Sequence, residues 1–190
     1  MNELYGKLFN KALEGDTDCG GLMAYNYVSG EPVTGLSEGR PMFVRSANDK
    51  FNLANFMRAH LYGAIGVLKI GNDILLKEEQ VKVSRITGHG GYFKTPGVGQ
   101  RMLAAALNSP ISVMETAGEG GAWGIALLAG YMVKNPDQLT LADYLEEVVF
   151  AGNKGTSIAP TPEDVEGFER YIENYKSGLA IEQCAVEHKK

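Results

Sequence analysis

The sequence is poor in the residues that build disulfide frameworks and zinc sites. Its 190 residues include two cysteines, Cys19 and Cys184, and three histidines, with no C-x-x-C pair and no histidine cluster. Two isolated cysteines argue against a disulfide framework and against a bound zinc ion. We therefore expect two reduced thiols and no metal site.

Basic charge and long apolar runs are also scarce. The net charge is −5 at pH 7 and the pI is near 5.3, so the chain lacks the basic footprint that nucleic acids and anionic membranes attract. No apolar run is long enough to span a bilayer, and the opening MNELYGKLFN has no signal-peptide core. We expect a cytoplasmic protein that binds neither nucleic acid nor membrane.

Glycine, in contrast, is abundant. There are 24 glycines in 190 residues, against a usual share of about 7%. This excess indicates tight turns or close approaches of the backbone. Apolar residues make up 44% of the chain, enough for a sizeable core, and the length suits one domain with an extension.

Hydrophobic periodicity predicts alternating strands and helices. Strands are expected near residues 22–28, 42–46, 81–87 and 111–114. A long helix from about 52 to 78 should cover one face of their sheet with Leu53, Phe56, Leu61, Ile65 and Leu68. This alternation predicts an α/β fold, a single mixed sheet flanked by helices. Residues 1–135 should form this domain, and residues 136–190 a peripheral helical extension.

The stretch RITGHGGYFKTPGVGQRMLAAALN, residues 85–108, is a strand–glycine–helix corner. Gly90 and Gly91 follow the strand and permit positive φ and close approach of bare backbone to a ligand. Thr95 stands at a natural N-cap with Pro96 at the first helical position, and a helix N-terminus favours phosphate. The alternative is a tight connection that binds nothing. The corner is neither a P-loop nor a dinucleotide fingerprint.

Two nearby features are less specific. A second glycine corner, ETAGEGGAWG at residues 115–124, leads into another helix, and its glycines could simply admit a neighbouring helix. His89 lies inside the first glycine turn. A lone histidine without a paired nucleophile is weak evidence for catalysis, so its role stays open.

The order of these motifs resembles the C-terminal domain of the FGGY carbohydrate kinases, the family of glycerol kinase, xylulokinase and ribulokinase. The resemblance rests on four stretches in order: GGLMAYNYVSGEPVTGL, GRPMFVRSANDKFNLANFMRAHLYGAIGVLK, RITGHGGYFKTPGVGQRMLAAALNSPISV and ETAGEGGAWGIALLAGYM. It implies a ribonuclease H-like, actin-like ATPase domain, with the active site in a cleft between two halves. The tail GFERYIENYKSGLAIEQCAVEHK is similar to the end of pentulose-kinase-type members.

The resemblance also implies a nucleotide site. It places Gly90 and Gly91 against the nucleotide, and Thr95 where some members use an asparagine. ATP would be the cofactor, with Mg²⁺ in the full-length enzyme, and a pentulose or similar carbohydrate would bind only with the amino-terminal lobe. The family's aspartate base falls upstream of the matching region, so we assign no catalytic residue and no metal ligand. We expect this chain to be inactive alone.

A free-standing nucleotide-binding or interaction module without catalysis is the alternative function. A reading frame that continues upstream into a missing lobe would favour the kinase, and a genuine stop codon there would favour the module. In either case an exposed lobe interface would favour self-association into a homo-oligomer.

Overall fold

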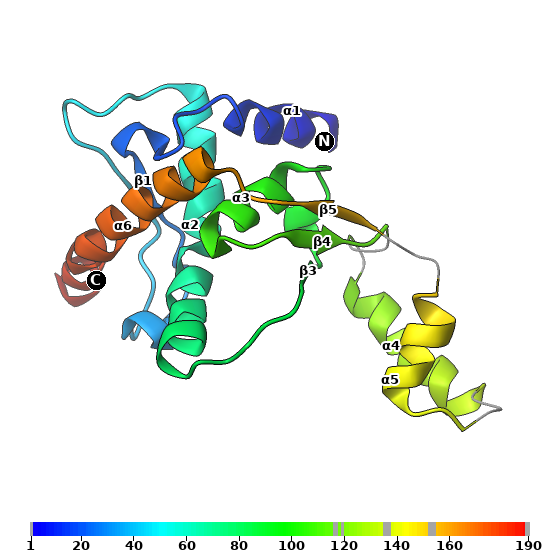
Figure 1. Ribbon diagram of the computed structural model, residues 1–190. Coiled ribbons are helices and arrows are strands. Elements are labelled where there is room, and N and C mark those ends of the chain that lie inside the picture. The colour runs from blue at the N-terminus through cyan, green and yellow to red at the C-terminus, as the bar shows by residue number, and fades with distance from the viewer. Residues whose placement is uncertain (1, 116–117, 119, 135–137, 152–154, 189–190) are drawn as a thin grey trace.

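The computed structural model describes residues 2–115, 118, 120–134, 138–151 and 155–188 (Figure 1). Its helices are α1 (Asn2–Ala12), α2 (Leu53–Asp73), α3 (Val98–Leu107), α4 (Gly120–Val133), α5 (Leu141–Asp143) and α6 (Pro162–His188). Its strands are β1 (Met23–Tyr25), β2 (Met42–Val44), β3 (Ile86–Gly88), β4 (Ile111–Val113) and β5 (Thr156–Ile158). Helices α2 and α5 continue into π-helical turns, Ile74–Glu78 and Tyr144–Val149. None of the described helices is long and apolar enough to cross a membrane.

The strands form two sheets, which corrects the expectation of a single one. Strands β1 and β2 pair antiparallel, whereas β3 pairs parallel with β4 and β4 pairs antiparallel with β5. The three-stranded sheet is mixed, as expected. Helix α2 contacts β1 and α3, and α3 contacts β4 and β5. The two helices therefore lie between the two sheets and prevent the sheets from pairing with each other (Figure 1).

The long central helix forms where the sequence predicts it, but only part of the predicted apolar stripe faces the core. Asn52 caps its start, with its side-chain oxygen accepting from the Asn55 N–H at 2.9 Å. Leu61 and Ile65 are buried as expected, whereas Leu53 and Leu68 are 52% and 50% exposed. The core side instead carries small residues and Tyr62, because α6 packs there.

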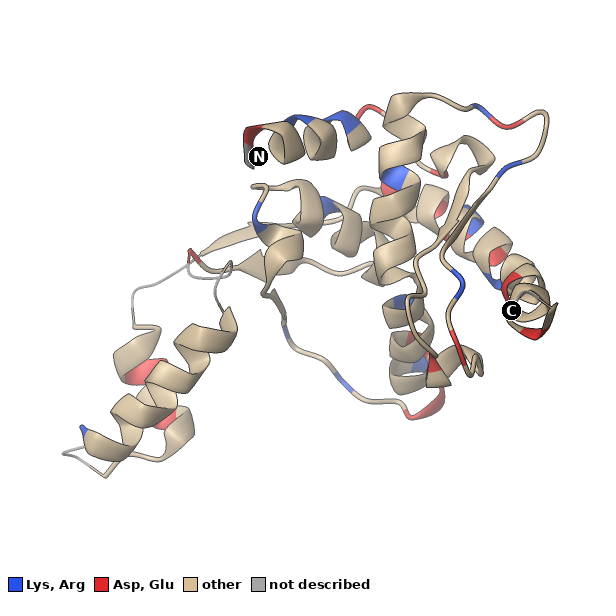
Figure 2. Cartoon of the chain, turned by 180° about the vertical axis from the view of Figure 1, so that it is seen from behind, with Lys and Arg blue, Asp and Glu red and all other residues tan. Residues whose placement is uncertain are grey.

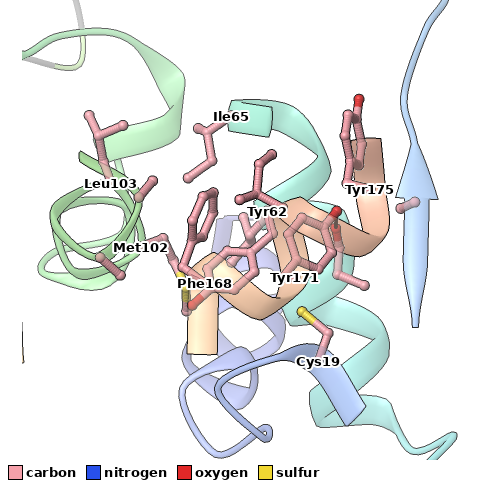
Figure 3. Packing of buried hydrophobic residues seen from close by; sticks show 14 of the residues in the cluster. Cys19, Tyr62, Ile65, Met102, Leu103, Phe168, Tyr171 and Tyr175 are labelled. Carbon is pink, nitrogen blue, oxygen red and sulfur yellow. Dashed lines mark hydrogen bonds between the residues drawn. The ribbon is translucent and has the colours of Figure 1, made fainter. Parts of the chain in front are cut away.

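The last helix belongs to the core, so the description of residues 136–190 as a peripheral extension is wrong for α6. Phe168, Tyr171, Ile172 and Tyr175 are almost completely buried, and they meet Tyr62 of α2 and Met102 of α3 (Figure 3). Their i, i+3, i+4, i+7 spacing was present in the sequence, among charged residues. The expected domain boundary at 135/136 lies outside the described residues.

Helices α4 and α5 form a hairpin that projects from the rest of the molecule (Figure 1). Helix α4 carries no charged residue between Gly120 and Val133, and the charged residues of the following helical segment are mainly acidic (Figure 2). Trp123 packs edge-on against Phe150, with ring centroids 5.7 Å apart. This ring contact joins the two arms of the hairpin, and no described residue of α4, α5 or the π-helical turn is buried.

A buried carboxylate fixes the far part of α6 to the segment before β2. Glu182 is fully buried. Its Oε1 accepts from the Arg40 backbone N–H at 2.7 Å, and its Oε2 finds no hydrogen-bond partner among the described residues. Burial raises the pKa of Glu182 and outweighs the opposing hydrogen bond and charge of Arg40.

We expect Glu182→Gln to stabilise the chain above neutral pH by about 1 kcal/mol, because the amide removes a buried negative charge and keeps an oxygen that accepts from the Arg40 N–H. Because its pKa is raised, the contribution of Glu182 to the stability of the folded chain is complete below about pH 4.3, the usual pKa of glutamate in an unfolded chain. It is lost as the pH rises through the folded-state pKa. Urea unfolding of both proteins across this pH range measures the difference.

Glu187→Gln is the control, an exposed change on the same helix that should leave the free energy of unfolding within about 0.5 kcal/mol of the parent. Lower stability of Glu182→Gln at pH 8 would contradict the prediction.

Candidate functional site

The glycine corner after β3 is a compact turn with open space at its tip. Strand β3 ends at Gly88, where any side chain would overlap the Phe93 ring. Gly90 has φ +101°, the left-handed region that favours glycine, while Gly91 does not. A Cβ atom added at Gly90 or Gly91 would have no atom within 4 Å other than those of its chain neighbours. The backbone of these two residues is therefore open to a ligand.

The helix after the corner begins later than the sequence predicted, so the expected cap is wrong. Helix α3 starts at Val98, with Gly97 at the N-cap in the left-handed conformation (φ +78°) and no side-chain cap. Thr95 precedes it in a turn in which its carbonyl accepts from the Val98 N–H at 3.3 Å. Glycine takes the left-handed conformation more readily than threonine does. The helix therefore begins directly after Gly97 and not after Thr95.

The three predicted residues lie in one short segment. The Phe93 N–H donates to the Gly90 carbonyl and the Lys94 N–H donates to the Gly91 carbonyl, at 3.1 and 3.2 Å. This 3₁₀ turn spans Gly91–Phe93, and Thr95 follows it in the chain. Gly90 and Gly91 lie at the open tip of the turn, and Thr95 lies between the turn and α3.

A cavity of about 810 Å³ adjoins this corner. Its walls come from β3, β4 and the segment after α5, and they include Arg85, Thr87, His89, Ser112, Met114, Glu146 and Phe150. Side chains alternate along a strand, which puts Arg85, Thr87 and His89 on one face. Helix α3 covers the opposite face, where the Gln100 side chain donates to the carbonyls of Ile111 and Thr156 at 3.1 and 3.0 Å.

His89 connects the glycine turn to the cavity. It belongs to the turn by sequence, lines the cavity, and lies against α4, where a side chain at Gly120 would approach its Nδ1 to 3.0 Å. The second glycine corner is described only in part, because residues 116, 117 and 119 lie outside the described residues. Gly120 itself is the first residue of α4 and lets that helix approach His89.

Sequence reasoning missed the far wall of the cavity. Glu146 is exposed and lines the cavity, and nothing in the local sequence marks it as part of a site. The alternation Arg85, Thr87, His89 was the signal that could have revealed the near wall. Chemically the site offers a cation, an imidazole, hydroxyls, a carboxylate and an aromatic ring around a ligand-sized volume. Among the described residues, no group of three or more His, Cys, Asp or Glu side chains is placed to hold a metal ion.

Comparison with known proteins identifies a family and a fold. The model of the C-terminal domain of the FGGY family of carbohydrate kinases matches residues 2–133, more than half of the chain. A search of curated proteins gave no match.

Solved structures share the fold at low sequence identity. Xylulose kinase from Rhodospirillum rubrum is 19% identical with a TM-score of 0.67, over 97% of this chain and 35% of that one. Gluconate kinase from Lactobacillus acidophilus is 19% identical with a TM-score of 0.68, over 95% and 34%. Plasmodium falciparum glycerol kinase with ADP is 17% identical with a TM-score of 0.60, over 93% and 33%. The chain spans about a third of these proteins, and the likeness confirms the ribonuclease H-like α/β fold.

Proposed function

The chain belongs to the FGGY family of carbohydrate kinases, and we propose that it supplies the nucleotide-binding side of a kinase that transfers the γ-phosphoryl group of ATP to a sugar hydroxyl. The observation that carries this proposal is the open backbone of Gly90 and Gly91 at the tip of a strand–turn–helix corner beside a large cavity. A structural relative is a glycerol kinase described with ADP, which supports a nucleotide at this domain.

The residues of the corner would bind and orient the nucleotide rather than react with it. Gly90 and Gly91 offer backbone that a ligand can approach without meeting a side chain. The cavity next to His89 is of a size typical for small-molecule sites. Thr95, at the end of the 3₁₀ turn, is the neighbouring hydroxyl. Phosphoryl transfer depends mostly on positioning and charge stabilisation, so such a wall is a necessary half of the site.

We further propose a pentulose or a similar polyol as the substrate of the complete enzyme. Xylulose and gluconate kinases are among its structural relatives, and the sequence of the tail agrees with pentulose-kinase-type members. The sugar contacts would come from the remaining two thirds of a full-length relative. Mg²⁺ would be held mainly by the nucleotide phosphates.

An amide chemical-shift titration with ADP tests the proposal. We expect shifts that cluster at residues 88–95, with a dissociation constant weaker than about 0.1 mM, or less than about 5.5 kcal/mol, because the ligand meets only one wall. Gly91→Val should abolish them by filling the open space at the tip. Since Gly91 has ordinary φ and free space around it, this variant should fold, which circular dichroism will verify.

Gly6→Val is the matched control, because Gly6 in α1 also has open space around it. It should leave the ADP shifts unchanged. The absence of shifts at residues 88–95 in millimolar ADP would refute the proposed site, as would undiminished shifts in folded Gly91→Val.

A further inference from the structure

The cavity beside the glycine corner has two unlike walls. The wall from the sheet is polar except for Met114, and it carries Arg85, Thr87, His89 and Ser112. The wall from the hairpin is apolar except for Glu146, and it carries Ala142, Leu145, Phe150 and Ala151. A cavity with an apolar wall and a few polar groups suits a planar heterocycle, which has apolar faces and a polar edge.

The ring of Phe150 is held in place on the hairpin wall. It packs edge-on against Trp123 of α4, with ring centroids 5.7 Å apart. The Phe150 backbone N–H donates to the Leu145 carbonyl at 2.8 Å. This bond closes the π-helical turn Tyr144–Val149, a rare geometry that is often found at functional sites. An aromatic ring fixed in this way offers a surface on which a nucleobase can stack.

Glu146 is the only acidic residue among the described residues that line the cavity. Its carboxylate has no hydrogen bond or ion pair to any described residue. An ionised carboxylate only accepts hydrogen bonds, so the ligand group beside it has to be a donor. The exocyclic amino group of adenine is such a donor. The negative charge of Glu146 also disfavours a phosphate close to it.

The polar wall runs from the glycine tip into the cavity. The side chains of Arg85, Thr87 and His89 follow β3, and a strand advances about 3.3 Å per residue, so this row is about 13 Å long. His89 precedes Gly90 in the chain, so this end of the row adjoins the open tip. A nucleotide with its phosphates at the tip, away from Glu146, would lie along the row and place its base inside the cavity.

We propose that the base of the bound nucleotide lies in this cavity against Phe150, and that Glu146 selects adenine by accepting a hydrogen bond from its exocyclic amino group. This assignment rests on the proposed function, because it needs a nucleotide at the glycine corner. Both residues bind the base and take no part in phosphoryl transfer.

Amide chemical-shift titrations of the 190-residue chain with ADP and with purine riboside 5′-diphosphate, which is ADP without the amino group, test this assignment. We expect ADP to shift the amide signals of residues 145–150 in addition to those of residues 88–95. The parent should bind the analogue about 10-fold more weakly than ADP, because a hydrogen bond to a charged group is lost. Glu146→Ala should bind ADP about 10-fold more weakly than the parent does, and should no longer distinguish it from the analogue.

Glu147→Ala is the matched control, because Glu147 is exposed and is not one of the described residues that line the cavity. It should keep the parent's preference for ADP over the analogue. Phe150→Leu should weaken the binding of both nucleotides by about 5-fold or more, since stacking on the ring does not depend on the amino group. Circular dichroism verifies that each variant folds.

Equal affinity of the parent for ADP and the analogue, or a preference for ADP that survives Glu146→Ala, would overturn the role of Glu146. Tighter binding of GDP than of ADP would overturn the choice of adenine. ADP shifts confined to residues 88–95 would place the base outside the cavity, so that this assignment fails while the proposed nucleotide site stands. The absence of ADP shifts at residues 88–95 would refute the nucleotide site and this assignment together.

Discussion

The isolated chain is expected to show no sugar-dependent ATP turnover, with rates below about 0.01 s⁻¹. Ordinary kinases turn over at about 1–100 s⁻¹, and loss of a general base alone costs about 10² to 10⁴ in rate. The chain covers about a third of the kinases it resembles. A sugar held by no second wall also loses the positioning that brings its hydroxyl to the phosphoryl group.

A coupled assay for ADP release measures this, with xylulose, gluconate and glycerol each added in turn with ATP and Mg²⁺. A full-length kinase of the family serves as the positive control in the same buffer. Turnover near 1 s⁻¹ that depends on one of these compounds would mean that the chain carries a complete site. ADP binding at the glycine corner without turnover is the combined outcome we expect.

The sequence predicted the elements that are specified locally. The helix beginning near residue 52 has both a cap, Asn52, and a sustained helical period, so its start was predicted within one residue. Strands β1, β2 and β4 also fall inside the predicted ranges, because their apolar residues lie in short runs bounded by turn residues. The glycine corner was also predicted, because it follows a strand and precedes a helix whatever surrounds it.

The features that depend on distant partners were not predictable. β5 lies in the stretch AGNKGTSIAPTP, whose glycines and prolines do not indicate a strand, and it becomes one because β4 offers it an edge. Val81 and Val83 have strand-like alternation, yet they are exposed and precede β3. The cavity is formed by three segments, residues 85–89, 112–114 and 142–151, and of these only Arg85–His89 carried a recognisable pattern.

One buried carboxylate, also unpredicted, ties three helices together. Asp164 of α6 is 1% exposed. It meets Arg58 of α2, whose Nη2 lies 2.7 Å from Oδ1, and Arg101 of α3, whose Nε lies 2.9 Å from Oδ2. Thr161 adds a hydroxyl donor at 2.8 Å. Arg58 itself is 1% exposed and also donates to the carbonyl of Gly15 and the hydroxyl of Tyr62.

These contacts decide the sign of the pH dependence at Asp164. Burial alone would raise the pKa of Asp164, but the hydrogen bonds from Arg101, Thr161 and Arg58 outweigh it and lower the pKa. A lowered pKa means that the group's contribution to stability is complete above the unfolded-state value, about 3.9. The contribution is lost as the pH falls through the folded-state pKa.

Asp164→Ala is therefore expected to lower the free energy of unfolding by about 3–5 kcal/mol, because it leaves the buried charge of Arg58 without its carboxylate. A loss of that size is a large part of the roughly 5–15 kcal/mol that holds a domain folded.

Arg101→Ala is the matched comparison. The Arg101 side chain is 44% exposed, so its loss should cost no more than about 1 kcal/mol. Asp164→Asn keeps an acceptor for Arg58 and should fall between the two, which preserves a measurable value if the alanine variant does not fold. Urea unfolding at pH 7 ranks the three variants. Equal losses for Asp164→Ala and Arg101→Ala would show that the buried charge on Arg58 is not what makes Asp164 necessary.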